Sequence, residues 1–398
     1  MDAPTPIAVG YGPLTIRLLV NSAETECEIL AAEFTATNSA VATGPVSPIV
    51  VHALFISFCA KRATDTATVS EVFAAFDAAY CRPVNMHIVR VVDKHGLTTE
   101  DSRTVLRGYY AGWSVSPHHL ESRSRCVVLP KDALAVFGGA LGCAKGAECL
   151  DIVRDLVDVY GPLVDGYLGA LTEFVQREIQ DSYIAHFYSH AMDVEAWIVD
   201  PKSAPAPEYL DSPPVAFLLL GLVQLLRLLV LSKTFGLSVG QLVKQLDAVA
   251  GHSHGLIIAA AVAASSPSDD ASFTAASKRA LGMMMLFGCL PQLVSPQPAL
   301  HPLAVSECEH VEGTPSPMAS VRGVPRQIVD AVLEKYNKFV KDDSEAHVFL
   351  SVVDTDTSFL ISGNIKSLVQ VVLNVRKRAA AVNEDQSNVP FLSRKPEV

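Results

Sequence analysis

The feature that most constrains this chain is the pentapeptide Gly251-His252-Ser253-His254-Gly255, which lies between two apolar runs. The preceding run, 246–250, ends on small residues and is interpreted as the end of a buried strand. The following run, 256–264, is rich in alanine, meets no proline until Pro267 and predicts a helix. A serine on a sharp strand-to-helix turn exposes its hydroxyl, and the helix N-terminus favours negative charge beside it. The sequence therefore predicts a nucleophile at Ser253; the alternative is a glycine-rich turn with an incidental serine.

Length and charge restrict the class of protein. The 398 residues exceed one ordinary domain, so two or three domains are expected. The apolar fraction of 49% is ample for large cores, and the charged fraction of 18% suits a surface partly covered by partners. The net charge of -11 argues against a nucleic-acid partner. The eight cysteines form no CxxC pair and no zinc spacing, and no signal peptide is visible, so a reduced, cytoplasmic chain without a metal site is expected.

One apolar segment, 215–231, could be mistaken for a membrane span. It is shorter than the roughly 20 residues that a span needs, and it contains Gln224 and Arg227. The expectation is a helix inside a protein core, with no membrane span and with Arg227 either snorkelling to the surface or paired. Ser212-Pro213-Pro214 gives this helix a good start and Gly236 a plausible end.

The first part of the chain is predicted to be mainly helical. A strand is expected at 10–20, a strand or a helix at 86–92, and helices at 26–36, 49–62, 66–80 and 101–112. A polar, exposed linker is expected at 114–125; its His118-His119 pair is better explained by a solvated loop than by a metal site.

The pattern changes near Cys126. A buried strand is expected at 133–137, followed by a glycine-rich loop that could supply backbone N–H groups to an oxyanion hole. Helices are expected at 148–160, 166–182 and 272–290, and an irregular, proline-rich segment at 201–214. Past Pro291 the predicted order is strand 318–321, helix 325–340, strands 347–353 and 359–363, and helix 365–378. This order indicates a ferredoxin-like subdomain without its last strand.

Six segments carry a family resemblance: AVFGGALG at 135–142, LDSPPVAFLLLGLVQLLRLLVLSKTFGLSVGQL at 210–242, AGHSHGLIIAA at 250–260, EGTPSPMASV at 312–321, FLISG at 359–363 and DQSNVPFLSRK at 385–395. With them the chain resembles acyl-CoA:acyl-carrier-protein transacylases. More narrowly, it resembles the N-terminal acetyltransferase region of the fungal fatty acid synthase β subunit, including versions dedicated to polyketide starter units. The resemblance covers nearly the whole chain.

The resemblance implies an α/β fold class. An α/β-hydrolase-like acyltransferase body would occupy 128–398 and be incomplete at its C-terminus, with a ferredoxin-like subdomain inserted at 316–381. A mainly helical α+β domain of the synthase β type would precede it at 1–127. The implied activity is transfer of an acetyl or short starter acyl group from coenzyme A to the phosphopantetheine arm of an acyl carrier protein, in a cytoplasmic hetero-oligomer that includes the synthase α subunit. No bound cofactor is expected, and no flavin site.

The family's site residues carry over by position. Ser253 would take the acyl group, and the backbone N–H groups of His254 and Ala140 would form the oxyanion hole. Ala140 stands where the family has the Gln of FGGQG, and His254 stands where it has the Gln of GHSQG. His254 is not expected to be the general base, because a residue directly after the nucleophile usually points away along the helix. Phe287 would line the acyl pocket at the place where malonyl-specific relatives carry an Arg, so malonyl is excluded.

The family's general base is a His in a PFHS-type stretch beyond the SRK segment, and the sequence reaches Val398 before such a stretch. None of His301, His310 and His347 has the right context. The expectation is an N-terminal piece of a longer polypeptide or a naturally truncated subunit, a poor enzyme alone with apolar surface exposed for partners. Two alternatives to the acyltransferase stay open. The first is a non-catalytic scaffold of the synthase. The second is a serine hydrolase, which is disfavoured because the Asp165-Gly166 pair lies upstream of the elbow.

Overall fold

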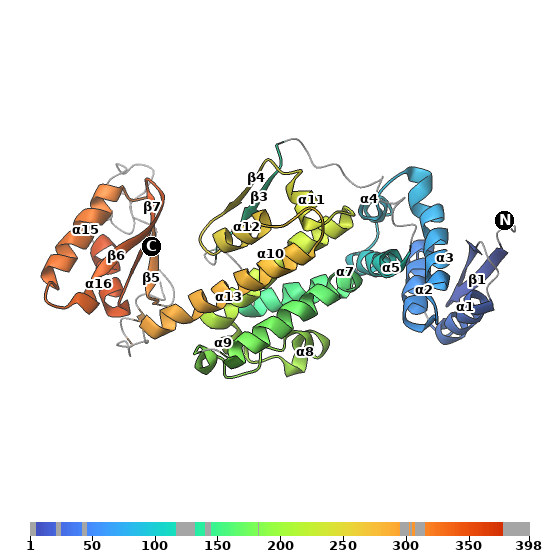
Figure 1. The fold of residues 1–398 in the computed structure, drawn as a ribbon, viewed down its shortest axis with the longest axis horizontal. Helices are drawn as coiled ribbons and strands as arrows, with labels where there is room; N and C mark the ends of the chain where they lie inside the picture. Colours follow the sequence, from blue (N-terminus) through green and yellow to red (C-terminus); the bar gives the residue numbers. More distant parts are fainter. Residues whose placement is uncertain are drawn as a thin grey trace. The chain divides into compact units, whose positions relative to one another are not determined.

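The structure is a computed structural model that describes residues 5–20, 25–41, 46–116, 132–139, 145–181, 183–294, 302, 305–306 and 315–376. The chain is a mixed α/β protein in which helices predominate (Figure 1). It divides into two compact units, 1–290 and 291–398. The expected boundary between residues 127 and 128 lies outside the described residues.

The first unit opens with a β-hairpin. Strand β1 (Thr5–Tyr11) pairs antiparallel with β2 (Leu14–Val20), from Thr5↔Val20 to Tyr11↔Leu14. The prediction of a single strand at 10–20 was wrong, because Gly12, with a φ of 54°, turns the chain within that segment.

Helices then build the first core. They are α1 (Thr25–Asn38), α2 (Pro48–Arg62), α3 (Thr66–Phe76), α4 (Ile88–Lys94) and α5 (Thr99–Val115). The segment 86–92 was predicted to be either a strand or a helix, and α4 shows that it is a helix from Ile88 onward. The hairpin and these helices share one hydrophobic core, which includes the fully buried Phe55, Phe73 and Tyr109. The His118-His119 pair lies outside the described residues.

Helix α7 (Gly146–Asp181) is one continuous helix, where two helices were predicted. Pro162 lies inside it and has no N–H to donate to the carbonyl of Asp158, one turn earlier. The Nε of Arg107 on α5 donates to that carbonyl instead, at 3.2 Å. The helix continues through the proline because a neighbouring helix supplies the missing donor.

The described α-helices between α7 and the last helix of the first unit are α8 (Val194–Val199), α9 (Pro207–Leu210), α10 (Pro213–Thr234), α11 (Val239–Val243) and α12 (Gly255–Ala263). Helix α13 (Ala271–Val294) follows. Helices α7 and α10 lie side by side (Figure 1). Among the described residues, α10 is the one helix long and apolar enough to span a membrane, yet 72% of its apolar window is buried inside the protein. That burial favours the core helix expected from the sequence.

A short parallel sheet leads to the elbow. Strand β3 (Leu134–Phe137) pairs with β4 (Ala248–Gly251), from Leu134↔Ala248 to Phe137↔Gly251. Both strands were predicted to be buried, and this was wrong for their outer face: Leu134 and Val136 are 63% and 69% exposed. The alternate residues Ala135 and Phe137 pack on the core of α7 and α10, so the described helices bury one face of the pair.

The second unit contains strand β5 (Met318–Arg322), helix α15 (Arg326–Phe339), strands β6 (Val348–Thr355) and β7 (Ser358–Gly363), and helix α16 (Ile365–Arg376). The strands form an antiparallel sheet in the order β5-β7-β6. Pro325 caps α15 rather than lying in its first turn. The helices and one face of the sheet enclose a small core around Phe359 and Ile361.

Candidate functional site

Ser253 occupies the strand-to-helix turn as predicted. Strand β4 ends at Gly251, and α12 begins at Gly255. Ser253 has a φ of 54°, in the left-handed region that a residue with a side chain rarely adopts. Such strain is concentrated at functional sites, and it is the backbone geometry of a nucleophile elbow. The side chain of Ser253 is exposed.

The two glycines of the pentapeptide are required by close backbone approaches. A Cβ on Gly251 would lie 2.3 Å from the carbonyl oxygen of Gly255, and a Cβ on Gly255 would lie 2.1 Å from that of Phe137. The backbone N–H of His252 donates to the same Phe137 oxygen at 2.9 Å. These contacts fasten the elbow to the end of β3, so the loop after β3 must lie beside Ser253.

That loop touches the nucleophile directly. A Cβ on Gly139 would lie 2.6 Å from the Cβ of Ser253 and 3.1 Å from its Oγ. The next residue, Ala140, lies outside the described residues, so its role as an oxyanion donor stays a prediction. The other predicted donor, the backbone N–H of His254, lies at the N-terminus of α12, where the first N–H groups have no acceptor within the helix. Within the described part of the chain, this N–H forms no hydrogen bond.

The His254 side chain corrects one expectation. Its Nδ1 lies 3.5 Å from Ser253 Oγ, so the ring does reach back toward the nucleophile. The ring also packs against Phe217 of α10, with the ring centroids 4.0 Å apart. Burial lowers the pKa of His254 below its ordinary 6.5, which keeps the imidazole neutral near pH 7. The distance is at the outer limit of a hydrogen bond, so this contact activates the hydroxyl weakly.

Phe287 lies near the C-terminal end of α13, and its side chain is 44% exposed. The adjacent Gly288 packs on the first turn of α10, because a Cβ there would lie 2.6 Å from the carbonyl oxygen of Pro213. Phe217, which contacts His254, is one turn further along the same helix. The structure thus brings Phe287 to the helix that borders the elbow, and its place in an acyl pocket stays a prediction.

The general base remains unassigned. His301 and His310, and the segment 385–395, lie outside the described residues. His347 precedes β6 in the second unit, and its buried Nε2 has no partner among the described residues. In the described part of the chain, no group of three or more His, Cys, Asp or Glu side chains could hold a metal ion.

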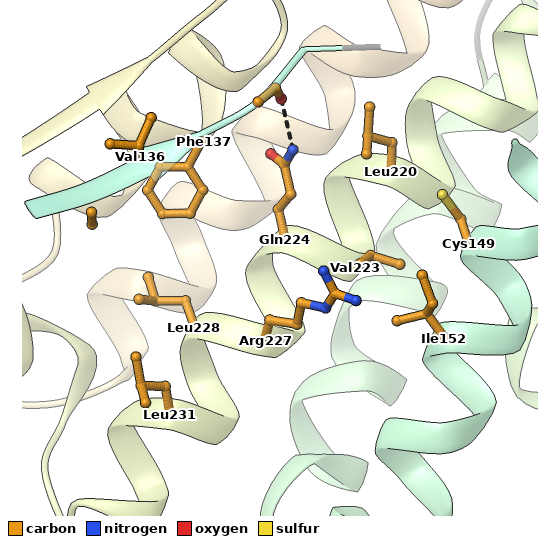
Figure 2. A pocket seen from close by; sticks show the side chains of 12 residues that line it. Val136, Phe137, Cys149, Ile152, Leu220, Val223, Gln224, Arg227, Leu228 and Leu231 are labelled. Carbon is orange, nitrogen blue, oxygen red and sulfur yellow. Dashed lines mark hydrogen bonds between the residues drawn. The ribbon is translucent and has the colours of Figure 1, made fainter. Parts of the chain in front are cut away.

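A cavity of about 500 Å³ lies between β3, α7 and α10 (Figure 2). Apolar side chains such as Phe137, Ile152 and Leu228 line most of it. Its two polar side chains come from α10. Arg227 is exposed, as expected for a snorkelling side chain, and it forms no ion pair with any described residue.

Gln224, the other polar lining residue, was noted in the sequence only as an interruption of an apolar segment. Its Nε2 donates to the carbonyl oxygen of Gly138 at 2.8 Å, the dashed bond in Figure 2. The signal that would have identified it is the amide itself, because a polar group inside a core helix needs a partner.

Comparison with known proteins places the chain in a family. The family model described as "Starter unit:ACP transacylase in aflatoxin biosynthesis" matches residues 146–395. The chain is 31% identical to the fatty acid synthase subunit beta of Schizosaccharomyces pombe over 309 residues, 77% of this chain and 14% of that protein. It is 30% identical to the fatty acid synthase beta subunit aflB of Emericella nidulans over 332 residues, 79% of this chain and 15% of that protein.

A third relative, the fatty acid synthase subunit beta of Saccharomyces cerevisiae, is 24% identical over 330 residues, 80% of this chain and 16% of that protein. The chain therefore spans 14 to 16% of the length of these three relatives. The family match covers more than half of the chain, and the relatives match most of it. The chain belongs to the starter unit:ACP transacylase family, and over most of its length it is similar to the beta subunits of fungal fatty acid synthases.

Proposed function

We propose that this chain is an acyltransferase module of a fungal-type fatty acid synthase and moves a starter acyl group from coenzyme A to an acyl carrier protein. The observation that carries the proposal is the left-handed Ser253 on the turn between β4 and α12, inside a region that matches a transacylase family. The relatives are themselves named as beta subunits of fatty acid synthases, which supports a hetero-oligomer that contains an α subunit.

The reaction proceeds in two steps through an acyl ester. Ser253 Oγ attacks the thioester carbonyl, and the developing oxyanion is stabilised by the backbone N–H of His254 and by that of Ala140. Collapse of the tetrahedral intermediate breaks the carbon–sulfur bond and releases the coenzyme A thiol, with the serine proton passing to a base and then to sulfur. The pantetheine thiol of the carrier protein then gives its proton to the base and attacks the ester carbonyl. Collapse of the second intermediate breaks the bond between the carbonyl carbon and Ser253 Oγ, and the proton returns to Oγ.

We also propose that the chain has the body and the subdomain that the family resemblance implies. The parallel pair β3-β4 with the elbow supports an α/β-hydrolase-like body over 128–398. The element order β5-α15-β6-β7-α16 supports a ferredoxin-like subdomain over 316–381. Residues 1–127 would form the preceding synthase-type domain. The proposal needs no bound cofactor and assigns the protein to the cytoplasm.

The acyl group is proposed to be acetyl or a short alkyl group. Phe287 offers a free carboxylate no donor, and burying an unpaired carboxylate in an apolar site is strongly unfavourable.

The decisive experiment is acetylation of Ser253. Incubation with acetyl-CoA should add one acetyl group, located at Ser253 by peptide mass spectrometry. Ser253→Ala should abolish it, while Ser268→Ala, at an exposed serine of the same unit, should not. Acetyl labelling that survives in the Ser253→Ala protein would overturn the assignment.

A non-catalytic scaffold is the second candidate. It is favoured by Ala140, which replaces the glutamine that the family places in the oxyanion loop. A folded protein that assembles with synthase subunits but never acetylates Ser253, even within the complex, would support the scaffold.

A further inference from the structure

Gln224 connects the core to the loop beside the nucleophile. The segment 215–231 is otherwise apolar apart from Arg227, so an amide in its middle is an exception to the pattern. Its Nε2 donates to the Gly138 carbonyl at 2.8 Å (Figure 2). Since a carbonyl oxygen only accepts, the nitrogen of the amide must face Gly138. The opposite atom, Oε1, is buried with no hydrogen-bond partner among the described residues.

An amide with one buried, unpartnered atom is less favourable than an apolar side chain of the same shape. A leucine would fill the same space between Leu220 and Leu228 without this penalty. The bond to Gly138 is therefore the feature of this side chain that an apolar residue could not replace.

The bonded carbonyl belongs to a flexible peptide. Gly138 and Gly139 follow β3 in succession, and two adjacent glycines restrict the rotation of the peptide plane between them very little. The plane is trans, so its C=O and its N–H point in opposite directions. Holding the Gly138 oxygen toward α10 fixes the direction of the Gly139 N–H and the start of the next peptide.

This peptide is also in contact with the nucleophile. A Cβ on Gly139 would lie 3.1 Å from Ser253 Oγ, and a Cβ on Gly255 would lie 2.8 Å from the Gly138 oxygen. A rotation of the 138–139 peptide would therefore move atoms against both the serine and the start of α12.

We infer that Gln224 is a positioning residue for acyl transfer, which holds the Gly138–Gly139 peptide in its place against Ser253. The inference rests on the proposed function and adds to it a residue outside the nucleophile motif. Gln224 itself touches neither substrate nor Ser253; it acts through one backbone carbonyl.

The test compares two substitutions at Gln224 with a matched control. Gln224→Leu keeps the volume and removes the donor; Gln224→Glu keeps the shape and, when ionised, only accepts. Gln176 of α7 is the control, because its Nε2 also donates to a backbone carbonyl, that of Met192 at 3.4 Å. Gln176→Leu removes a bond of the same kind in the same unit, away from the elbow.

The readout is the single-turnover acetylation of Ser253 at increasing acetyl-CoA, together with the thermal midpoint. Both Gln224 variants should lower the maximal rate by about 10- to 100-fold, less than the loss of a whole oxyanion donor. The half-saturating concentration should change by less than about twofold, because the defect lies in the transition state. Gln176→Leu should retain the parent rate with a comparable change in thermal midpoint.

Maximal rates of the Gln224 variants within about twofold of the parent would overturn the inference. A serine-directed fluorophosphonate probe tests the role of Gln224 separately from the proposed function, since the probe reacts with an activated serine without any acyl-CoA. If the parent reacts with the probe but never with acetyl-CoA, the proposed acyl transfer is wrong. The rates at which the parent and the Gln224 variants react with the probe then decide whether Gln224 has a positioning role. If the parent reacts with neither reagent, crystal structures of the parent and of Gln224→Leu decide, because an unmoved 138–139 peptide would overturn the positioning role.

Discussion

A methyl group at residue 139 should disable the site without changing any polar group in it. In Gly139→Ala the new Cβ would lie 2.6 Å from Ser253 Cβ, whereas ordinary contacts begin at 3.4 Å, so the loop and the elbow must separate by about 0.8 Å. The other two near atoms, the His252 carbonyl oxygen and Ser253 Oγ, are both at 3.1 Å. All three belong to backbone or to a short side chain, so no flexible group can move aside.

The kinetic effect follows from this displacement. A misplacement of about 1 Å between reacting groups lowers rates by roughly 100-fold, so we expect Gly139→Ala to acetylate Ser253 about 10- to 100-fold more slowly. The stability should fall by about 1–3 kcal/mol, the usual result of overpacking.

The assay is the initial rate of acetyl-Ser253 formation by intact-protein mass spectrometry, with urea unfolding of the same samples. Gly166→Ala is the matched control, because nothing lies within 4 Å of a Cβ at that position of α7. That variant should be slightly more stable and equally active, since alanine favours a helix. Parent-like acetylation by Gly139→Ala would refute the contact between this loop and the nucleophile.

Three further predictions concern histidines and selectivity. Phe287→Arg should shift loading from acetyl-CoA toward malonyl-CoA, measured by competition mass spectrometry; equal loading of both by the parent would show that Phe287 does not border the acyl group. His254→Gln should slow acetylation by less than about tenfold, because the 3.5 Å contact to Ser253 Oγ is long; a loss above about 100-fold would identify His254 as the base. Burial lowers the pKa of His52 to about 3 from 6.5, so the unfolded chain binds the extra proton and stability falls as pH drops below 6.5. At about pH 5 the loss from His52 should be roughly 2 kcal/mol relative to pH 7.5 in urea unfolding, and His52→Leu, which removes this titrating group, should reduce the pH dependence by that amount; an unchanged pH dependence would refute it.

Elements whose determinants are local could be predicted from the sequence. The long apolar helix α10 and the strand-turn-helix around Ser253 follow from the spacing of apolar residues, glycines and prolines. Helix α7 could not, because its continuity through Pro162 depends on Arg107, a donor more than 50 residues earlier in the chain. The exposure of Leu134 likewise depends on what covers the outer face of the sheet, which no local pattern records.

The candidate site likewise contains features that the sequence predicted and features that it did not. Ser253 was identified from its motif. The prediction that the His254 ring points away from Ser253 was wrong, because it assumed an ordinary start of the helix. The left-handed backbone of Ser253 changes the direction of the chain entering α12 and brings Nδ1 to 3.5 Å from Oγ. Gln224 was missed as a site residue because its partner, Gly138, lies 86 positions away in the sequence.

A serine nucleophile must be held in position and must lose its proton, and the described residues meet these two requirements to different degrees. Orientation is provided within the described chain: close glycine contacts fasten the elbow to β3, and Gln224 donates a hydrogen bond to the Gly138 carbonyl at the end of that strand. Among the described residues activation is weak, because the imidazole of His254 is at the limit of hydrogen bonding to Ser253 Oγ and packs against Phe217. Because a well-placed base contributes about 10²–10⁴ in rate, the described residues hold the Ser253 hydroxyl in position better than they remove its proton.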